Sequence, residues 1–395
     1  MGSEMCIRDR VILNEEPSSY ERPLQERLEQ LVEAHNRYTP SGQAGRVYLK
    51  NAALLPEADL ILLKAVACVV LVAARGTLPQ QLAVAVEPPE LLETLTRRRV
   101  PREPSAPLPF MELSYFNSLG GFTLDGREYA IYLGPGTNTP APWVNVIANP
   151  SFGTMVSETG AGFTWFGNSQ RNRLSGWSND PVLDPATEAI YIRDEESGAF
   201  WSPTAEPIRE ETAYRARHGS GYTVFEHNSN GINQELIVFV PVDDSGGKPV
   251  KLQRLHLTNG SSRRRKLSIT YYVELTLGEN RETSQMHIVT RWDSEVGALF
   301  AQNHYHPEYG ERVTFVAVSP QCESYGGDRT SFIGRNRSLS NPAAMDVTGL
   351  SQRTGAGLDP CAALRIVLEL NPGEQRDISF MLGQAGSVDL SLIHI

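Results

Sequence analysis

The stretch LQRLHLTNGSSRRRKLSITYYVEL, Leu252–Leu275, alternates apolar and polar residues on both sides of a turn-rich centre. Such alternation is typical of a β-strand with one buried face, and Asn-Gly-Ser-Ser is typical of a turn. We therefore expect two strands joined by a solvated hairpin turn. The cations from Arg263 to Lys266 then belong to the turn and do not form a nucleic-acid patch.

The same pattern continues over residues 110–386. Short alternating or apolar runs recur between Gly, Asn, Asp and Pro, among them REYAIYL, EAIYIRD, QELIVFVPV, RVTFVAVS, ALRIVLEL and DISFMLG. Strands this numerous must be covered face to face or closed on themselves. The sequence thus predicts a mainly β fold, one large antiparallel sandwich. It has no P-loop and no GxGxxG turn that would favour a nucleotide-binding fold.

Residues 20–99 have a helical pattern instead. Apolar residues recur at helical spacing after Pro23, which suits a first helical turn. A second helix is expected over residues 57–75, with the apolar run AVACVVLVAA buried in it, and a third over PPELLETLTRRR. That run is about half the length of a membrane span. The prolines of VPREPSAPLPF then predict a stiff linker over residues 100–109.

Composition excludes some classes of protein. The 395 residues suit two domains, and the net charge of -10 argues against a nucleic-acid partner, which needs a concentrated basic face. The four cysteines lie far apart, without the spacing of a zinc site or a disulfide framework, so a reducing compartment is expected. No secretory signal is recognisable.

Both ends of the chain look foreign. MGSEMCIRDR at the start and SLIHI at the end are similar to translated sequencing-adapter read-through. We expect residues 1–19 and 387–395 to be a non-native leader and tail, and the natural protein to be longer.

The stretch TPAPWVNVIANPSFG, Thr139–Gly153, carries no charge, and Glu158 is the only charged residue between Glu128 and Arg171. Aromatic faces stack on the C–H faces of sugar rings, and Asn amides pair with hydroxyls, so a sugar would suit this surface. The alternative is a loop-rich part of the sandwich core whose aromatics are simply buried.

Three further constellations have both a chemical and a structural interpretation. His304 and His306 lie on one side of an extended strand as a metal pair would, but no third ligand is near, which favours a loop pair. RHGSGY, Arg217–Tyr222, fits either a ligand contact or a tight hairpin turn. Asp180 and Asp184 lie in turn-rich sequence, where Asp commonly caps turns, and nothing nearby predicts the apolar pocket of a general acid.

Five ordered motifs carry a family resemblance. They are YFNSLGGFTLDGREYAIYL, TPAPWVNVIANPSFGTMVSETGAGFTWFGNSQRNRLSGWSNDPV, WSPTAEPIRE, ARHGSGYTVFEHNSNGI and GDRTSFIGRNRSL. Together they resemble the N-terminal sandwich of glycoside hydrolase family 94, formerly glycosyltransferase family 36, over roughly residues 20–386. The helical segment ahead of FNSLGGF is most similar to the cyclic β-1,2-glucan synthase branch, beside the cellobiose and chitobiose phosphorylases.

The resemblance implies a galactose mutarotase-like supersandwich, normally followed by an (α/α)6 barrel that carries the catalytic Asp. Inorganic phosphate is the co-substrate of such inverting phosphorylases, and phosphate needs no base to activate it. The barrel is missing here, so no catalytic residue and no cofactor or metal is expected in this chain. WSND at Trp177–Asp180 only superficially matches the barrel segment.

The resemblance also implies that the sandwich contacts a β-glucan oligosaccharide near the barrel entrance, often across a homodimer. We expect the substrate-contacting residues to be Trp143, Asn145, Arg171, Arg173, Trp177, Arg217, His218 and Tyr222. The parent enzyme would work on the cytoplasmic face, with a glucan synthase anchored in the bacterial inner membrane.

Two other functions stay open. An autonomous sugar mutarotase would need a His acid and a Glu base facing one cleft, and His218 or His227 with Glu226 or Glu235 are the available partners. A purely structural or dimerising scaffold would instead bury Trp143, Arg173 and Trp177.

Overall fold

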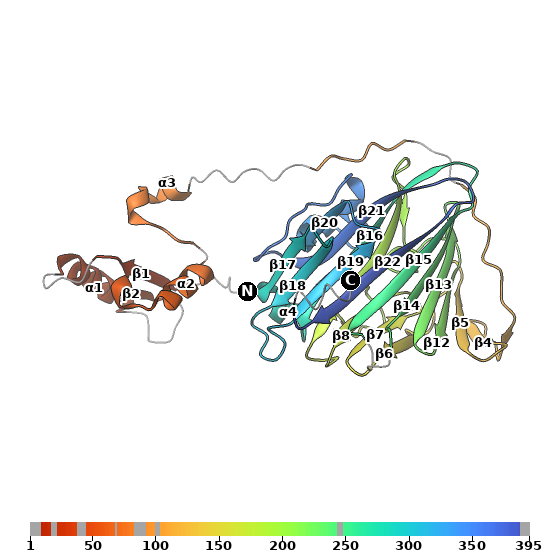
Figure 1. The fold of residues 1–395 in the computed structure, drawn as a ribbon, viewed down its shortest axis with the longest axis horizontal. Helices are drawn as coiled ribbons and strands as arrows, with labels where there is room; N and C mark the ends of the chain where they lie inside the picture. Colours follow the sequence, from red (N-terminus) through yellow and green to blue (C-terminus); the bar gives the residue numbers. More distant parts are fainter. Residues whose placement is uncertain are drawn as a thin grey trace. The chain divides into compact units, whose positions relative to one another are not determined.

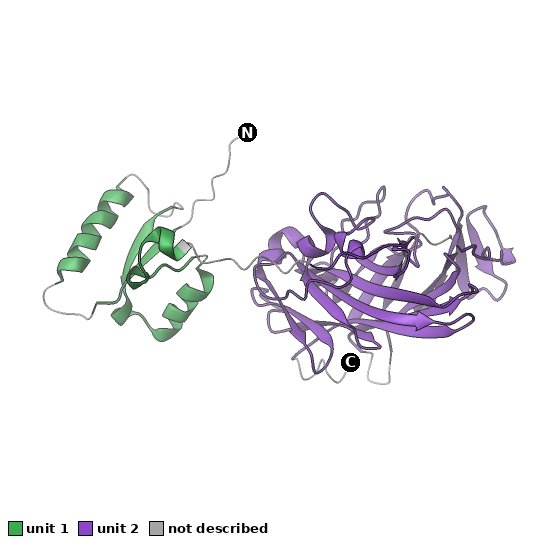
Figure 2. Cartoon of the chain, turned by 90° about the horizontal axis from the view of Figure 1, so that it is seen from above, with its two compact units in different colours: residues 1–89 green, residues 90–395 purple. Residues whose placement is uncertain are grey.

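The structure is a computed structural model that describes residues 9–16, 22–37, 45–67, 69–82, 92–98, 103–242 and 248–387. The chain divides into two compact units, residues 1–89 and residues 90–395 (Figure 2). The division falls ahead of the Pro-rich stretch at residues 100–109.

The first unit contains strands as well as helices. Its described elements are β1 (Arg10–Asn14), α1 (Pro23–Asn36), β2 (Val47–Asn51), η1 (Ala52–Leu54), α2 (Glu57–Val66), η2 (Ala73–Arg75) and α3 (Leu78–Leu82). The expected first helix is confirmed, with Pro23 in its first turn. β1 pairs with β2 in parallel, Arg10 opposite Val47, and lies within the residues expected to be a leader.

The second helix is shorter than the helix predicted over residues 57–75. α2 ends at Val66, Ala67 is extended, and Val69, Val70 and Leu71 are more than half exposed. The prediction of a buried helix over the whole run is therefore wrong for the described residues. β-branched side chains lose rotamer freedom in a helix, so a run this rich in Val has a low helical propensity.

The third predicted helix is also wrong where the structure describes it, over residues 92–98. Thr94 forms a β-bridge with Val347, and the backbone N–H of Leu95 donates to the carbonyl of Asp346 at 2.8 Å. Backbone groups that would close helical turns pair with a distant loop instead. The rest of that prediction falls on residues outside the described ones.

Two large antiparallel sheets form the second unit, and their strands run through the described residues from Leu113 to Ala385 (Figure 1). In order, the eleven-stranded sheet contains β17 (Ile288–Asp293), β18 (Ala298–Asn303), β19 (Val313–Ser319), β22 (Gln375–Ala385), β15 (Val250–Asn259), β14 (Ile232–Phe239), β13 (Tyr222–Ser229), β12 (Tyr214–Gly219), β5 (Glu128–Leu133), β4 (Gly120–Thr123) and β3 (Leu113–Ser114). The mainly β fold and the large antiparallel sandwich are confirmed.

The second sheet has nine strands among the described residues. In order they are β11 (Phe200–Trp201), β10 (Glu188–Asp194), β16 (Arg265–Gly278), β9 (Arg173–Ser175), β8 (Gly162–Phe166), β7 (Phe152–Ser157) and β6 (Val144–Ala148), with β21 (Pro360–Leu370) pairing β16 and β20 (Ser324–Asp328). Short helices α4 (Arg281–Ser284), η3 (Gln285–His287), α5 (Arg329–Ile333) and η4 (Ala343–Asp346) lie in connections. β6 is an edge strand, and it contains the centre of the uncharged stretch.

The two strands of the opening stretch lie in different sheets. β15 pairs with β14 and β22, whereas β16 pairs with β10 and β21. Arg265 is buried and its Nε donates to Asp194 at 2.9 Å, while Nε of Arg263 donates to Glu103 at 3.2 Å. The predicted solvated hairpin turn is therefore wrong: the turn crosses between sheets, and acidic residues distant in sequence bind its cations.

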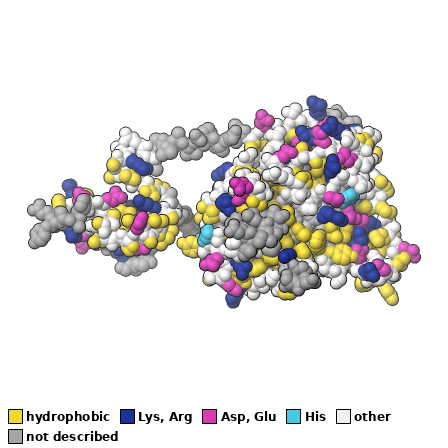
Figure 3. All heavy atoms as spheres, viewed as in Figure 1, with side chains coloured by type: hydrophobic (Ala, Val, Ile, Leu, Met, Phe, Trp, Pro, Cys, Tyr) yellow, Lys and Arg dark blue, Asp and Glu magenta, His cyan; other side chains and the backbone are white. Residues whose placement is uncertain are grey.

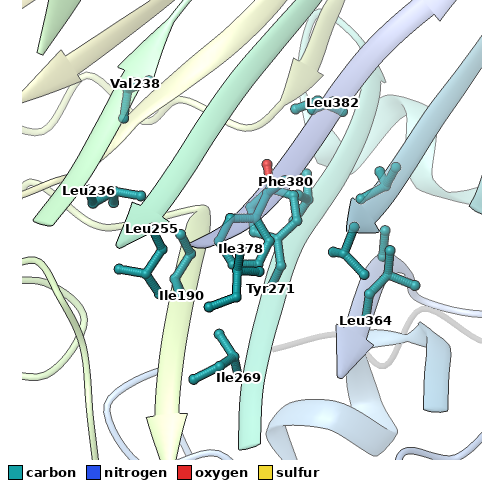
Figure 4. Close-up of a cluster of buried hydrophobic side chains, with 14 of the residues drawn as sticks. Ile190, Leu236, Val238, Leu255, Ile269, Tyr271, Leu364, Ile378, Phe380 and Leu382 are labelled. Carbon is teal, nitrogen blue, oxygen red and sulfur yellow. The ribbon is translucent and has the colours of Figure 1, made fainter. Parts of the chain in front are cut away.

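The core lies between the sheets. Alternate residues of facing strands point inward, such as Leu255 on β15, Ile378 on β22 and Ile269 on β16, and these side chains meet in the middle of the sandwich (Figure 4). Tyr271 and Phe380 bring the two sheets together, with ring centroids 5.1 Å apart. Burying each such side chain stabilises the fold by about 1.5–3 kcal/mol.

No described helix is long and apolar enough to cross a membrane. On the face drawn in Figure 3, acidic and basic side chains are interspersed over the second unit. That face does not present the concentrated basic surface that nucleic acid requires.

Candidate functional site

The eight predicted contact residues separate into two groups. Trp143, Asn145, Arg217, His218 and Tyr222 converge where the edge strand β6 meets the β12–β13 hairpin of the other sheet. Arg171, Arg173 and Trp177 lie in and around β9. Both groups contain aromatic and cationic side chains, and the groups differ in what those side chains contact.

Asn145 ties the two sheets together. Its Nδ2 lies 3.0 Å from the carbonyl oxygen of Gly219, 2.9 Å from that of Tyr222 and 3.0 Å from Oγ1 of Thr223. An amide nitrogen has two hydrogens, so these three acceptors use its donor capacity fully. Asn145 therefore positions the hairpin against the edge strand.

Both ring nitrogens of His218 also have hydrogen-bond partners. Its Nε2 donates to the carbonyl of Trp143 at 2.9 Å, and its Nδ1 accepts from the hydroxyl of Thr223 at 3.0 Å. Burial lowers the pKa of His218 below its ordinary value, against the opposing effect of the Trp143 bond. The imidazole is thus a neutral bridge between the sheets, with both nitrogens bonded.

Arg217 and Tyr222 belong to an ionic network on the outer face of the sheet. Arg217 donates to Glu128 at 2.6 Å and to Glu226 at 2.9 Å, and the Tyr222 hydroxyl donates to Glu128 at 2.8 Å. Nε of Arg215 donates to Glu226 at 2.6 Å. Burial alone would raise the pKa of Glu226, but the two arginines hold it below its ordinary value.

Trp143 is a packing residue immediately before β6. Its half-buried ring meets Tyr129 edge-on at 5.9 Å and packs against the cluster of Ile131, Leu133 and Tyr214. Its backbone N–H donates to the carboxylate of Glu158 at 2.7 Å. Burial raises the pKa of Glu158, the one charged residue of the surrounding segment.

The second group forms an open surface. The ring of Trp177 stacks on Phe163, with centroids 4.9 Å apart and planes 15° apart, and the Arg173 guanidinium lies 5.4 Å from the Trp177 ring and 5.5 Å from the Phe163 ring. Trp177 is 36% exposed. With Trp165, which contacts Phe163 at 5.2 Å, these residues make what we call the aromatic platform: Phe163, Trp165, Arg173 and Trp177.

A glycine allows Trp165 to lie against the sheet. Phe163 and Trp165 share one face of β8 because they are two residues apart. Trp165 is opposite Gly153 on β7, and a Cβ at that glycine would lie 2.3 Å from the indole ring. The platform therefore needs Gly at position 153.

Arg173 is held by the backbone. Its Nε donates to the carbonyl of Ser169 at 3.0 Å, and its Nη1 donates to the carbonyl of Glu279 at 2.9 Å. Partial burial lowers its pKa. Arg171 is exposed, and its backbone carbonyl accepts a hydrogen bond from His306 at 3.0 Å.

Phe163 and Trp165 were missed as site residues. Their signal was the alternation in GFTWF, Gly162–Phe166, which places both rings on one strand face. The ring of Phe166, on the other face of the strand, packs against the core.

The residues proposed for a mutarotase pair do not come together. His227 is fully buried, 3.2 Å from Glu210 and stacked on Tyr214 at 3.7 Å. Glu226 precedes it on β13 and so points to the opposite face, in register with Glu235. His218 points inward as well, so neither histidine shares a cleft with Glu226 or Glu235.

The remaining constellations have structural roles. Oδ1 of Asp180 caps a turn by accepting from the N–H of Val182 at 2.9 Å, and Oδ2 of Asp184 accepts from the hydroxyl of Ser157 at 2.6 Å. Within the part of the chain that the structure describes, no group of three or more His, Cys, Asp or Glu residues could hold a metal. His304 and His306 lie in the loop between β18 and β19, as a loop pair would.

One ionic cluster lies inside the sandwich. Glu188 accepts hydrogen bonds from Lys251, from Ser175 at 2.6 Å and from Thr164 at 2.6 Å, beside a small cavity. Burial would raise the pKa of Glu188, but Lys251 and the hydroxyls hold it below its ordinary value. The cluster is a satisfied core ion pair, and Phe163 of the platform lines the cavity beside it.

Most of the second unit is matched by a known domain. Residues 127–393 match the model of the supersandwich domain of glycosyl hydrolase 94, so the chain belongs to this family. The cyclic β-(1,2)-glucan synthase NdvB of Rhizobium meliloti is 33% identical over 96% of this chain and 14% of that protein. The N,N'-diacetylchitobiose phosphorylase of Vibrio proteolyticus is 27% identical over 67% of this chain and 33% of that protein.

The chain therefore spans a third or less of the length of these curated relatives. Among solved structures, the GalM/aldose epimerase homologue of C. elegans is 9% identical, with a TM-score of 0.37, and covers 62% of this chain and 100% of that one. Family membership rests on the domain match and not on this distant likeness.

Proposed function

We propose that this chain is the sugar-contacting supersandwich of a larger β-glucan synthase or phosphorylase, and that the aromatic platform makes the contact. The observation that carries the proposal is the partly exposed ring of Trp177, which stacks on the buried ring of Phe163 and is flanked by Arg173. Stacked rings offer flat apolar faces to pyranose rings. The guanidinium of Arg173 is held beside the rings by two backbone carbonyls, and its other N–H groups can donate to sugar hydroxyls.

The chemistry of the parent enzyme extends this proposal. The relatives are named as a glucan synthase and a disaccharide phosphorylase, and a barrel outside this chain would supply the catalytic Asp. Inorganic phosphate would be the co-substrate there, and this chain would hold no cofactor. A homodimer, and a place at the cytoplasmic face of the bacterial inner membrane, belong to the same proposal.

The test is calorimetric titration of the 395-residue chain with β-1,2-linked glucose oligomers, with cellobiose as the comparison sugar. We expect saturable binding that Trp177→Ala weakens about tenfold, the loss of roughly 1.4 kcal/mol of contact. Phe122→Ala is the matched control, because Phe122 is an exposed aromatic on the other sheet. No binding at millimolar sugar would overturn the proposal and leave the domain as a scaffold.

A further inference from the structure

The loop that carries Arg171 is held by a second loop from the other sheet. Residues 167–172 connect β8 to β9, and residues 304–312 connect β18 to β19. The ring of Tyr309 meets Phe166 edge-on at 6.2 Å, and a Cβ at Gly167 would lie 2.9 Å from its hydroxyl. The two loops therefore pack closely, and we call this contact the clasp.

His306 is the polar centre of the clasp. Its Nδ1 lies 3.2 Å from the backbone nitrogen of Glu308 and 3.1 Å from that of Tyr309, and its Nε2 lies 3.0 Å from the carbonyl oxygen of Arg171. The two backbone N–H groups can only donate, so Nδ1 must be unprotonated. Nε2 then carries the hydrogen and donates to Arg171. A single neutral tautomer satisfies all three bonds.

The clasp connects to the platform through the backbone. Asn168 caps the same loop by accepting from the N–H of Arg171 at 2.9 Å, and the carbonyl of Ser169 accepts from the side chain of Arg173 at 3.0 Å. Arg173 in turn lies over the rings of Phe163 and Trp177. A shift of residues 167–172 would thus move the guanidinium that covers both rings.

We propose that His306 is a positioning residue for the platform and that its protonation weakens sugar contact. The inference rests on the proposed function. A proton on Nδ1 would place an N–H against two N–H donors and open the turn at Glu308 and Tyr309. Other charged and titratable groups near the clasp are Arg171, Glu308, Tyr309 and Arg312, and His304 and Glu311 lie in the same loop. His287 stacks on the neighbouring Tyr305.

The test compares His306→Asn with His304→Asn in the full chain. Asn at 306 can still accept from the two backbone N–H groups, as Asn168 does from Gln170 and Arg171 at 2.9 Å, but it is too short to reach the other loop. His304 is an exposed residue of the same loop and serves as the matched control. Circular dichroism melting checks that both variants fold.

For the wild type we expect affinity for β-1,2-linked glucose oligomers to fall about fivefold from about pH 8 to about pH 5, the value of one lost hydrogen bond. His306→Asn should bind about fivefold more weakly at the higher pH and show no further fall on acidification. His304→Asn should follow the wild type. Wild-type affinity and pH dependence in His306→Asn would overturn the inference.

A second measurement separates this inference from the proposed function. In protein labelled with ¹⁵N-histidine, the ring shifts should show the Nε2–H tautomer for His306 at the higher pH, and amide exchange of residues 167–172 should rise in His306→Asn. If the wild-type protein binds no sugar, the proposed function is wrong. The tautomer of His306 and the amide exchange of residues 167–172 still show whether His306 holds the two loops together. An Nδ1–H tautomer would refute the clasp even if sugar binds.

Discussion

The β12–β13 hairpin and the aromatic platform contain the same kinds of residue, yet their side chains are used differently. Arg217, His218 and Tyr222 on the hairpin have their polar atoms bonded to Glu128, Glu226, Trp143 and Thr223. On the platform, Arg173 is bonded only along its edge to carbonyls, and the Trp177 ring is 36% exposed. The hairpin links the two sheets, whereas the platform leaves part of the Trp177 ring exposed to solvent.

The difference shows that residue type alone does not identify a binding site. A buried polar group must find partners, and once its donors and acceptors are used it has little left for a ligand. The hairpin groups face the opposite sheet or the acids of neighbouring strands. The platform lies on and beside β8 and β9 in the middle of the smaller sheet, on the strand face opposite to Phe166, which packs against the core.

Among the variants that test this contrast, Arg217→Ala should have the largest effect on stability. The change leaves the largely buried carboxylates of Glu128 and Glu226 with fewer partners, so we expect the free energy of unfolding to fall by about 3 kcal/mol. Urea denaturation measures it. Arg254→Ala, at an exposed arginine 4.0 Å from Asp377, should cost less than about 0.5 kcal/mol. Equal losses in the two variants would contradict the role assigned to the hairpin.

The variant Gly153→Ala tests how Trp165 packs in the aromatic platform. A methyl group 2.3 Å from the indole must displace Trp165 from β7, and we expect a loss of about 2 kcal/mol of stability together with weaker sugar binding. Thermal melting and calorimetry report the two effects. Gly134→Ala, where the nearest atom is 3.4 Å away, is the control and should change neither.

His218 gives the hairpin a pH dependence. Because burial lowers its folded-state pKa below 6.5, the unfolded chain binds the proton first, and stability falls as the pH drops below that value. The wild type should lose about 1 kcal/mol more than His218→Asn between about pH 7 and about pH 5. Denaturation midpoints at both pH values measure this. Parallel losses in both proteins would show that His218 does not cause the dependence.

The smallest effect is expected for Arg171→Ala. Arg171 contributes its backbone carbonyl to the clasp and its side chain is exposed, so stability should change by less than about 0.5 kcal/mol. A loss comparable to that of Arg217→Ala, measured under the same conditions, would erase the distinction between the two arginines.

The alternation of apolar and polar residues correctly predicted which side chains of these strands are buried in the sandwich. Leu255 and Leu257 on β15, and Ile269 and Tyr271 on β16, are buried in the core as their spacing indicates. Side chains of a strand alternate between its faces, so the buried set can be determined from the sequence without knowing the neighbouring strand.

Alternation did not predict which strands are neighbours in a sheet. β15 and β16 are consecutive, yet they lie in opposite sheets, and Arg265 between them is buried against Asp194. Residues 92–98 have a helical composition, yet they pair with the loop around Val347. Distant partners can satisfy backbone and charged groups as well as local ones do, so local propensity does not decide these cases.

The sequence by itself determined the strand content, the position of the first helix and the family resemblance, because these depend on local periodicity and ordered motifs. Only the tertiary structure decided that Trp177 stacks in the open while Trp143 packs at a sheet junction. Both are tryptophans beside a strand of the smaller sheet, and what distinguishes them is what packs against their rings. That depends on contacts between residues far apart in the chain.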